Sequence, residues 1–387
     1  MKSVLAALAV AFVLFIFTFY VDGEMGIILI AFLLIAPLLS LAMAVYARKR
    51  IRVSFDCDGY VKKGGELPVT VTIEKEGWCP LAVVEITPSA SEVFEKQEKS
   101  YRFSIFSSEP VSFAFNIKAL IGGNGEVSLP KICSCGFLGF ISLKLKEGLP
   151  AAKSVGVIPE IPDVKASSQL FRNIADIVTT SDDDEDKDTT MLFSANTVPG
   201  YEHREYIQGD PLKRVNWKLS SKKDKLMVRL DEAAASVQPM VLVDLYRSPS
   251  AKPEEAVVKE EKILQSAFGL ARLLVKQGIA STLVYRGSDG SMTAESVENP
   301  DAPSQILLKA LAVKVQPGMR ASLGAAGSSS CACVIASADC GEGISALTEA
   351  AKGDGGEVSL IAPSKDSPNS TDLPMWYLDG DNNFKLV

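Results

Sequence analysis

Two long apolar runs in the first 50 residues constrain the fold more than any other feature. Val4–Val21 and Met25–Ala47 contain no charged side chain. Each run is close to the roughly 20 residues that a helix needs to cross a bilayer. The residues between them, Asp22–Glu24, are only enough for a tight turn. The sequence therefore predicts a transmembrane helical hairpin over residues 1–50.

Basic residues flank this hairpin on both sides and predict its orientation. Lys2 precedes the first run, and the second run is followed by Arg48, Lys49, Arg50 and Arg52. Because basic residues are retained on the cytoplasmic side, we expect a two-pass protein of the cell membrane with both termini cytoplasmic. A cleaved signal peptide is the alternative for the first run. The second full-length run directly after it argues against that alternative.

Charge and cysteine spacing argue against nucleic-acid binding and against a zinc site. The chain of 387 residues has a net charge of −7, so we do not expect nucleic-acid binding, which needs clustered positive charge. Its seven cysteines are an odd number, which indicates reduced thiols in the cytoplasm. The spacing of Cys133, Cys135, Cys331 and Cys333 is unlike that of zinc sites, and we interpret them as small buried hydrophobic residues.

Residues 51–165 follow a period-two pattern that is typical of β-strands. Short alternating segments are separated by Gly-rich and Ser-rich turns such as Gly122-Gly123-Asn124. Antiparallel strands at this spacing predict an all-β sandwich. Residues 166–199 are expected to form an acidic linker or loop, because Ser181–Asp188 is dense in carboxylates that repel one another. A calcium loop is the alternative there, but the run lacks the required Gly and terminal Glu.

Residues 200–236 mix charge, aromatic rings and turn residues more densely than any other stretch. We expect a strand over His203–Ile207, a turn at Gly209, a helix that starts at Asp210-Pro211, and a strand over Lys225–Leu230. At helical spacing, polar residues would share one face of that helix: Asp210, Arg214, Trp217, Lys218 and Ser221. Such a face is either a partner-binding surface or a buried cluster that fixes a domain junction.

This stretch resembles the signature of domain-of-unknown-function family 58. The family pattern has Arg-x-Tyr-x-x-Gly-Asp, then Arg-x-[Ile/Val]-x-Trp-[Lys/Arg] and a following Ser. The matching residues here are Arg204, Tyr206, Gly209, Asp210, Arg214, Val215, Trp217, Lys218 and Ser220 or Ser221. Gly136–Phe140 and Val157-Ile158-Pro159 are similar to two further family fragments, although Ser134-Cys135 replaces the Asp-Pro of the first. The resemblance implies a membrane protein that works with a MoxR-type AAA+ ATPase and a transglutaminase-like membrane protein.

Residues 237–387 alternate between buried strands and amphipathic helices. Examples are the strand Val237–Tyr246 and the helix Pro253–Gln277, which Gly278 ends. This alternation predicts a mainly parallel sheet with helices on both faces. The family resemblance implies that this α/β domain is von Willebrand factor A-like.

The von Willebrand factor A fold often holds Mg²⁺ in an Asp-x-Ser-x-Ser loop, and the resemblance implies a counterpart here. The equivalent residues are Asp244 and Ser248, and Asp339 could add a second carboxylate. Tyr246 replaces the first Ser, and Arg247 adds a cation where a hard metal needs small oxygen ligands. The two interpretations are a working Mg²⁺ site and a decayed site whose loop keeps only its shape.

No arrangement of residues in the sequence identifies an enzyme. His203 is the single histidine, no nucleophile is evident beside it, and no phosphate-binding loop is present. We expect a membrane-anchored cytoplasmic interaction or assembly protein that uses no cofactor. The alternatives are a purely structural membrane protein with a decayed metal site and a hydrolase with an unrecognised carboxylate site.

Overall fold

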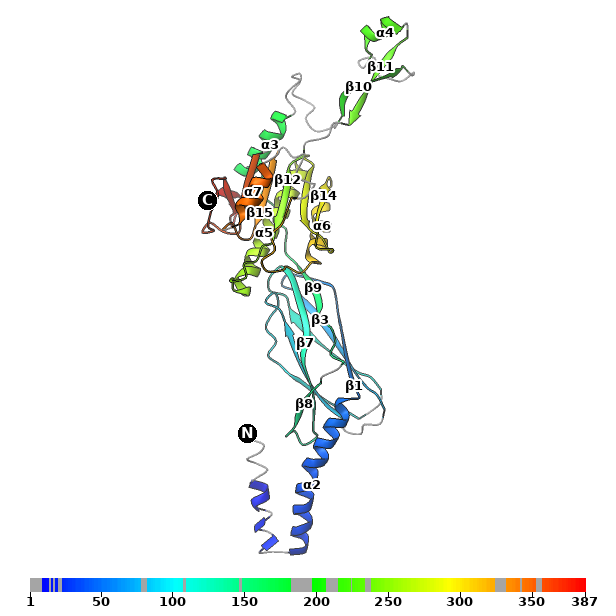
Figure 1. The fold of residues 1–387 in the computed structure, drawn as a ribbon, viewed down its shortest axis with the longest axis vertical. Helices are drawn as coiled ribbons and strands as arrows, with labels where there is room; N and C mark the ends of the chain where they lie inside the picture. Colours follow the sequence, from blue (N-terminus) through cyan, green and yellow to red (C-terminus); the bar gives the residue numbers. More distant parts are fainter. Residues whose placement is uncertain are drawn as a thin grey trace. The chain divides into compact units, whose positions relative to one another are not determined.

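A computed structural model gives the fold of the chain (Figure 1). It describes residues 9–13, 15–16, 18–19, 23–77, 82–106, 109–145, 148–181, 197–206, 215–223, 225–233, 238–323, 332–341, 343–352 and 357–387. The chain forms two compact units, each made of three chain segments. The first contains Met1–Glu160, Arg247–Leu264 and Leu307–Pro317, and the second contains Ile161–Tyr246, Gln265–Ile306 and Gly318–Val387.

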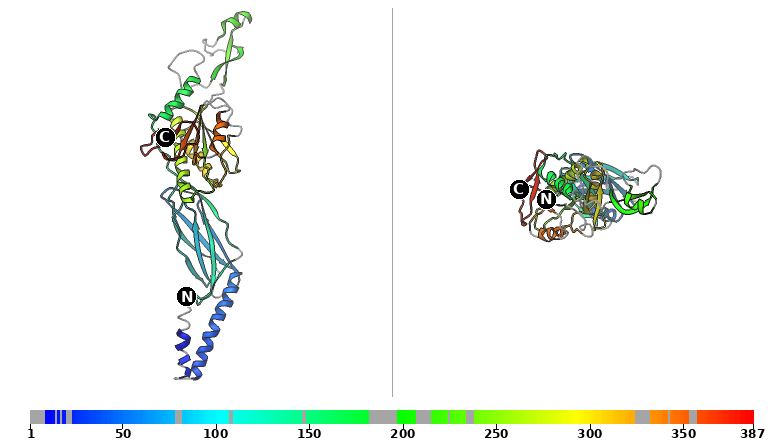
Figure 2. Two further views of the ribbon diagram at one scale, coloured as in Figure 1. Left: turned by 60° about the vertical axis from the view of Figure 1, so that its left-hand side comes forward. Right: turned by 90° about the horizontal axis from the view of Figure 1, so that it is seen from above.

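The first unit begins with an apolar helix, α2 (Gly23–Arg48). Among the described residues it is the one helix long and apolar enough to cross a membrane, and most of its apolar side chains are exposed. The first apolar run is described only at 9–13, 15–16 and 18–19, which are helical, so a second spanning helix is not established. These pieces lie alongside α2 in both views (Figures 1 and 2), and a side chain at Gly26 would overlap Thr18.

The predicted β-region forms two sheets in the same unit. The first sheet has the order β1 (Ile51–Cys57), β3 (Glu66–Lys75), β6 (Val111–Lys118). The second has the order β2 (Tyr60–Lys62), β9 (Lys153–Ile158), β7 (Gly123–Cys135), β4 (Ala82–Ala90), β5 (Tyr101–Ile105), and β8 (Ser142–Lys144) pairs with β7. All pairings are antiparallel except that of β2 with β9.

One hydrophobic core lies between these two sheets. Alternate residues of β3, such as Val69 and Val71, share it with residues of the second sheet, such as Val84 and Val127. Their exposure is 0% because the period-two pattern turns one face of each strand inward. The period-two pattern therefore predicted the β-region correctly. The parallel pairing of β2 with β9 was not predicted, since the sequence indicated antiparallel strands.

Part of helix α5 (Pro253–Lys276) also packs in the first unit. Val257 belongs to the sandwich core. The buried Glu261 carboxylate accepts a hydrogen bond from the backbone N–H of Gly122 at 2.9 Å and pairs with Lys63 Nζ at 2.8 Å. A buried carboxylate needs such partners, since an unpaired charge is costly to remove from water. The N-terminal half of α5 is therefore a fixed part of this unit.

The second unit is built on a seven-stranded sheet. Its order is β14 (Met292–Val297), β13 (Ser281–Arg286), β12 (Met240–Asp244), β15 (Ala332–Ser337), β16 (Glu357–Ala362), β17 (Met375–Leu378), β18 (Phe384–Leu386). The five inner strands β13, β12, β15, β16 and β17 are parallel, and the edge strands β14 and β18 pair antiparallel. Every residue of β12 and β15 is buried, as expected when both faces of a parallel sheet are covered.

Helices supply the cover for this sheet. Helix α7 (Ile344–Lys352) buries Ile344 and Leu347 in a core shared with Leu242 and Ile335. The C-terminal part of α5 buries a separate apolar stripe, which consists of Ala267, Phe268, Leu270, Ala271 and Leu274. Helix α6 (Ala302–Leu311) follows β14 in the chain. The predicted alternation of strands and helices is thus found, and β17 and β18 are additional strands.

A helix within residues 166–199 corrects the prediction of a linker or loop. Helix α3 spans Gln169–Ser181. Ser168 Oγ accepts a hydrogen bond from the backbone N–H of Phe171 at 3.3 Å, as a helix N-cap does. Leu170 and Ile174, four residues apart, are buried. The spacing of Leu170 and Ile174 is a helical signal in the sequence, whereas the linker prediction rested on the acidic run Ser181–Asp188. That run lies almost entirely outside the described residues.

Candidate functional site

The signature segment forms a two-stranded antiparallel sheet with a short helix between its strands. The strands are β10 (Thr197–Glu205) and β11 (Met227–Ala233), and the helix is α4 (Trp217–Lys223). Arg204 pairs with Val228 in the register of this sheet, and the backbone N–H of Tyr206 donates to Leu226 O at 2.8 Å. The predicted strand, helix and strand are therefore present, although their limits differ.

The described helix α4 begins at Trp217, and the predicted start at Asp210-Pro211 lies outside the described residues. Asn216 Oδ1 accepts a hydrogen bond from the Leu219 N–H at 3.1 Å, so Asn216 is the N-cap. Val215, just before it, forms an isolated β-bridge with Val228. This extended residue at 215 interrupts the helical face that the sequence predicted. Gly209, Asp210 and Arg214 lie outside the described residues.

The short helix has one buried side and one exposed side. Ser220 Oγ donates to Asn216 O at 2.8 Å and accepts from the Met227 N–H at 2.9 Å, which ties α4 to β11. Trp217 has 63% of its surface exposed, and Lys218 and Ser221 are exposed too. A large exposed indole is unusual, because aromatic side chains gain most when they are removed from water. The exposed residues of α4, which we call the α4 face, are Trp217, Lys218, Ser221, Lys222 and Lys223.

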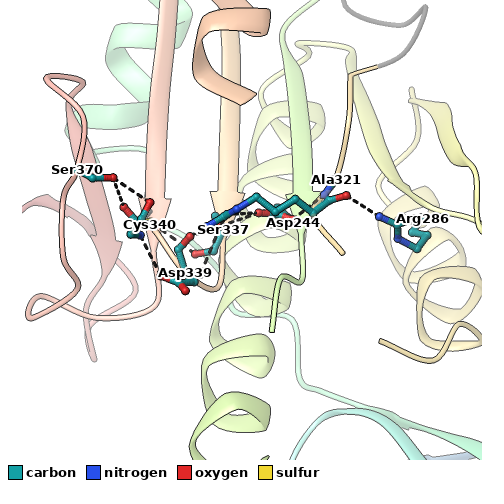
Figure 3. A network of polar contacts seen from close by, with 9 residues as sticks. Asp244, Arg286, Ala321, Ser337, Asp339, Cys340 and Ser370 are labelled. Carbon is teal, nitrogen blue, oxygen red and sulfur yellow. Dashed lines mark hydrogen bonds and ion pairs between the residues drawn. The ribbon is translucent and has the colours of Figure 1, made fainter. Parts of the chain in front are cut away.

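A buried polar centre lies at the carboxyl ends of β12 and β15 (Figure 3). The Asp244 side chain has 1% of its surface exposed. Its Oδ2 accepts from Ser337 Oγ at 2.8 Å and from Arg320 Nη1 at 3.0 Å, and its Oδ1 accepts from the Ala321 N–H at 2.9 Å. A cation and two hydrogen-bond donors therefore neutralise the buried carboxylate.

Arg320 is the residue that the sequence analysis missed. Its guanidinium donates to Asp339 O at 3.0 Å and lies 4.0 Å from the centre of the Tyr246 ring, a cation–π distance. Arg286 Nη2 in turn donates to Arg320 O at 2.8 Å. Arg320 is 76 residues from Asp244 in the chain, and no local pattern marks it. Only the folded sheet brings the two together.

The other predicted metal ligands are placed differently. Asp339 Oδ1 accepts from the Gly341 N–H at 2.9 Å within its own turn, and the Asp339 carbonyl accepts from Arg320. Ser248 Oγ is hydrogen-bonded with Ser250 Oγ at 3.0 Å. The part of the chain that the structure describes contains no group of three or more His, Cys, Asp or Glu side chains arranged to hold a metal. An Asp244 carboxylate oxygen, which a metal would need as a ligand, accepts a hydrogen bond from the Arg320 guanidinium. This arrangement disfavours Mg²⁺ binding, and the Mg²⁺ site remains a prediction.

Arg247 does not supply the cation at this centre, contrary to the sequence analysis. Its Nε and Nη2 donate to the two carboxylate oxygens of Glu260 at 2.8 and 2.9 Å, a bidentate pair. Glu260 lies on α5 and is buried. The positive charge of Arg247, which the sequence predicted beside the Mg²⁺ site, is therefore paired with Glu260.

The described cysteines are buried or partly buried, and His203 lies on β10. Cys133, Cys135 and Cys333 are buried, as predicted, and Cys331 lies outside the described residues. Burial raises the pKa of Cys333 and of Cys340 to about 12, which makes both poor nucleophiles at neutral pH. His203 pairs with Arg229 in the β10–β11 register.

Comparison with known proteins identifies the signature but no activity. No curated protein matches the chain. Among solved structures, a cohesin module of a Clostridium perfringens family 33 glycoside hydrolase is 14% identical, with 29% of this chain and 98% of that chain covered and a TM-score of 0.23. The native alpha-2-macroglobulin of Escherichia coli is 16% identical, with 29% and 17% covered and a TM-score of 0.23. A CARDB domain from Pyrococcus furiosus is 12% identical, with 28% and 94% covered and a TM-score of 0.22.

No functional conclusion follows from likenesses at these TM-scores. The sequence profile of one family, described as "Protein of unknown function DUF58", matches residues 202–323. This match begins within β10, includes α4 and β11, and continues through β12 to Arg320 and beyond. It confirms the resemblance that the signature residues indicated. Residues 202–323 of this chain are thus similar to the DUF58 family.

Proposed function

We propose that this protein is a membrane-anchored interaction protein that presents the α4 face to an acidic surface of a partner. The observation that supports it is the exposure of Trp217 on a short helix whose Lys218, Lys222 and Lys223 are also exposed. Aromatic and basic side chains together are typical of binding hot spots, where the ring supplies contact area and the charges select the partner. If the signature served only to lock the domain, its aromatic residue would be expected to be buried.

A MoxR-type AAA+ ATPase is our candidate partner, and a transglutaminase-like membrane protein is a second one. Both come from the family resemblance, to which the DUF58 match adds support. The strand order of the second unit also supports a von Willebrand factor A-like domain. Five parallel strands with an antiparallel strand at the β14 edge are what such an α/β domain would show.

Anchoring is proposed as a two-pass hairpin with both termini in the cytoplasm. The apolar helix α2, the overlap of Thr18 with any side chain at Gly26, and the basic residues after Arg48 support it. Gly23→Cys in intact cells should react with a thiol label that cannot cross membranes, whereas Leu120→Cys, an exposed position of the sandwich, should not. The reverse labelling pattern would overturn this orientation.

The binding test compares a double variant of the α4 face with a control variant that has the same lysine-to-glutamate change elsewhere. Trp217→Ala with Lys218→Glu should reduce capture of the purified MoxR-type ATPase by at least about tenfold, since hot-spot losses reach 1.4 kcal/mol and more. Lys352→Glu, at an exposed lysine in the last turn of α7, is the matched control and should leave capture unchanged. Equal capture by all three proteins would show that the α4 face is not the binding surface.

Stability must be measured beside binding, because a misfolded variant would also lose capture. Because Trp217 has 63% of its surface exposed, Trp217→Ala should change the free energy of unfolding by less than about 0.5 kcal/mol. Val215→Ala removes a buried side chain of the same segment and should cost about 2 kcal/mol. A large loss of stability in Trp217→Ala would favour the structural interpretation of the signature.

A further inference from the structure

The turn between β7 and β8 carries an exposed apolar tip. Residues Gly136–Ile141 read Gly-Phe-Leu-Gly-Phe-Ile and contain no charge. Phe137, Leu138 and Phe140 have 36%, 37% and 41% of their surface exposed. The turn is held in shape by the Gly139 N–H, which donates to Gly136 O at 2.8 Å, and Gly139 has a φ of 75°. Three large apolar side chains on one fixed turn form a patch that water disfavours.

This turn lies against the apolar helix α2 within the same unit (Figure 1). Ser134 Oγ, on β7, donates to Ala44 O at 3.1 Å. The Leu138 N–H donates to Ser40 Oγ at 3.5 Å, and any side chain at Gly136 would overlap that hydroxyl. Ser40 and Ala44 are buried by these contacts. As β7 advances toward its turn, its contacts therefore move toward the N-terminal, apolar part of α2.

The position of Ser40 along α2 sets the depth of the turn. A hydrocarbon core of about 30 Å corresponds to about 20 helical residues at about 1.5 Å each. Counted from Met25, such a span ends near Ala44, so Ser40 lies roughly 6 Å inside the hydrocarbon boundary. Tilting of the helix moves that boundary further along α2 and places Ser40 deeper. The tip of the turn then lies at the level of the upper acyl chains.

Basic residues on the flanking strands lie at the level expected for lipid headgroups. Lys144 follows Ile141 by three residues, roughly 10 Å along an extended strand. Lys131 precedes Gly136 by five residues on β7, and both lysines are exposed. Lys49, just after α2, is exposed as well. An apolar tip below a basic band is the arrangement by which interfacial segments bind membranes that contain anionic lipids.

We infer that the β7–β8 turn is a second membrane-binding element, which inserts Phe137, Leu138 and Phe140 into the bilayer that α2 crosses. The inference rests on the membrane anchoring proposed above. Its occupant is the lipid bilayer because the patch continues the exposed apolar surface of α2, which includes Leu41 and Val45. The turn would fix the sandwich against the membrane surface and prevent it from swinging freely on the helix.

The experiment measures the depth of the turn in the full-length protein. Leu138→Cys carries an environment-sensitive fluorophore, and the protein is reconstituted into vesicles of phosphatidylcholine and phosphatidylglycerol. Leu120→Cys is the matched control, because Leu120 is 45% exposed and precedes the far end of β7 at Gly123. The 13 residues of β7 span roughly 40 Å, well beyond the interface. Phe140→Cys gives a second probe on the turn if Leu138→Cys folds poorly.

At Leu138 we expect emission shifted to shorter wavelength and quenching by lipids that carry a nitroxide high on the acyl chain. At Leu120 neither effect is expected. The protein without an introduced cysteine gives the background from its own thiols. Equal behaviour of the two positions would overturn the inference. A wavelength shift without quenching by lipid would also overturn it, since another protein surface or a second copy would then cover the turn.

Flotation of the vesicles separates this inference from the anchoring on which it rests. If the chain does not float with the vesicles, the anchoring by α2 has failed and the turn has no membrane to enter. If the chain floats and Leu138 shows no lipid quenching, the anchoring stands and only the role of the turn is lost. If Phe137→Ser with Phe140→Ser abolishes quenching at Leu138 while flotation persists, the aromatic side chains hold the turn in the bilayer.

Discussion

Arg320 Nη1 lies 3.0 Å from Asp244 Oδ2, and the pair joins a loop after α6 to the carboxyl end of a central strand. Both side chains are largely removed from water. Ser337 Oγ, the Ala321 N–H and the Tyr246 ring complete the surroundings. A positive charge thus lies where the sequence suggested a magnesium ion. The guanidinium can hold the loop to the sheet without metal.

Removing Arg320 should destabilise the second unit strongly. Arg320→Ala leaves the buried Asp244 carboxylate without its counterion, which typically costs about 3 kcal/mol or more. Arg52→Ala is the matched control, because Arg52 forms an exposed pair with Glu76 and should contribute less than about 0.5 kcal/mol. Thermal unfolding of the full-length protein in detergent measures both. Equal unfolding temperatures for the two variants would contradict the structural role of Arg320.

Divalent cations should leave the stability of the wild-type protein unchanged. We expect the same unfolding temperature in EDTA and in millimolar Mg²⁺, because Arg320 contacts the Asp244 oxygen that a metal would use. A metal that bound only the folded state at 100 times its dissociation constant would add about 2.7 kcal/mol. A gain of that size would mean that Mg²⁺ displaces the guanidinium and that the predicted site works.

The Glu85–Arg102 pair should make stability depend on pH in the acidic range. Arg102 Nη2 donates to Glu85 Oε2 at 2.6 Å, and this hydrogen bond lowers the pKa of Glu85 below its ordinary value of 4.5. Above 4.5 the carboxyl group is ionised in both states, so its stabilising effect is fully present. As the pH falls from 4.5 through the lower folded pKa, the unfolded state binds the proton more readily and the effect is lost.

Comparison with Glu85→Gln isolates this contribution from other carboxylates. The wild-type protein should unfold at a higher temperature than the variant at neutral pH, and the difference should shrink below 4.5. Thermal unfolding of both proteins over a pH series gives the measurement. A difference that grows on acidification would show that the pKa of Glu85 is raised in the folded state.

Gly136 should be needed for the contact between α2 and the sandwich. A Cβ at this position would overlap Ser40 Oγ and approach Ser40 O to 3.3 Å, so Gly136→Ala should cost about 1 to 3 kcal/mol. Gly59→Ala is the control, since nothing lies within 4 Å of a Cβ there. Thermal unfolding in detergent distinguishes them. If both variants match the wild-type protein, α2 is not packed tightly on β7.

Local patterns of the sequence determined most of the secondary structure. The alternation in β3 and the burial of β12 follow from side-chain periods that need no long-range information. The apolar length of α2 likewise depends on composition alone. Asn216 caps α4, and the β-bridge of Val215 with Val228 just before it is a contact that no local period encodes.

The chemistry of the Asp244 centre was decided by the tertiary structure. The sequence predicted that Asp244 lies at the end of a strand and that Arg247 is the cation near it. The fold instead pairs Arg247 with Glu260 and brings in Arg320 across 76 residues of chain. The contact of the Gly136–Ile141 turn with Ser40 is also long-range, because Ser40 and Leu138 are 98 positions apart in the chain. Side-chain periods report which face is buried, but partners far apart in the chain are set by sheet order and packing, which no local period encodes.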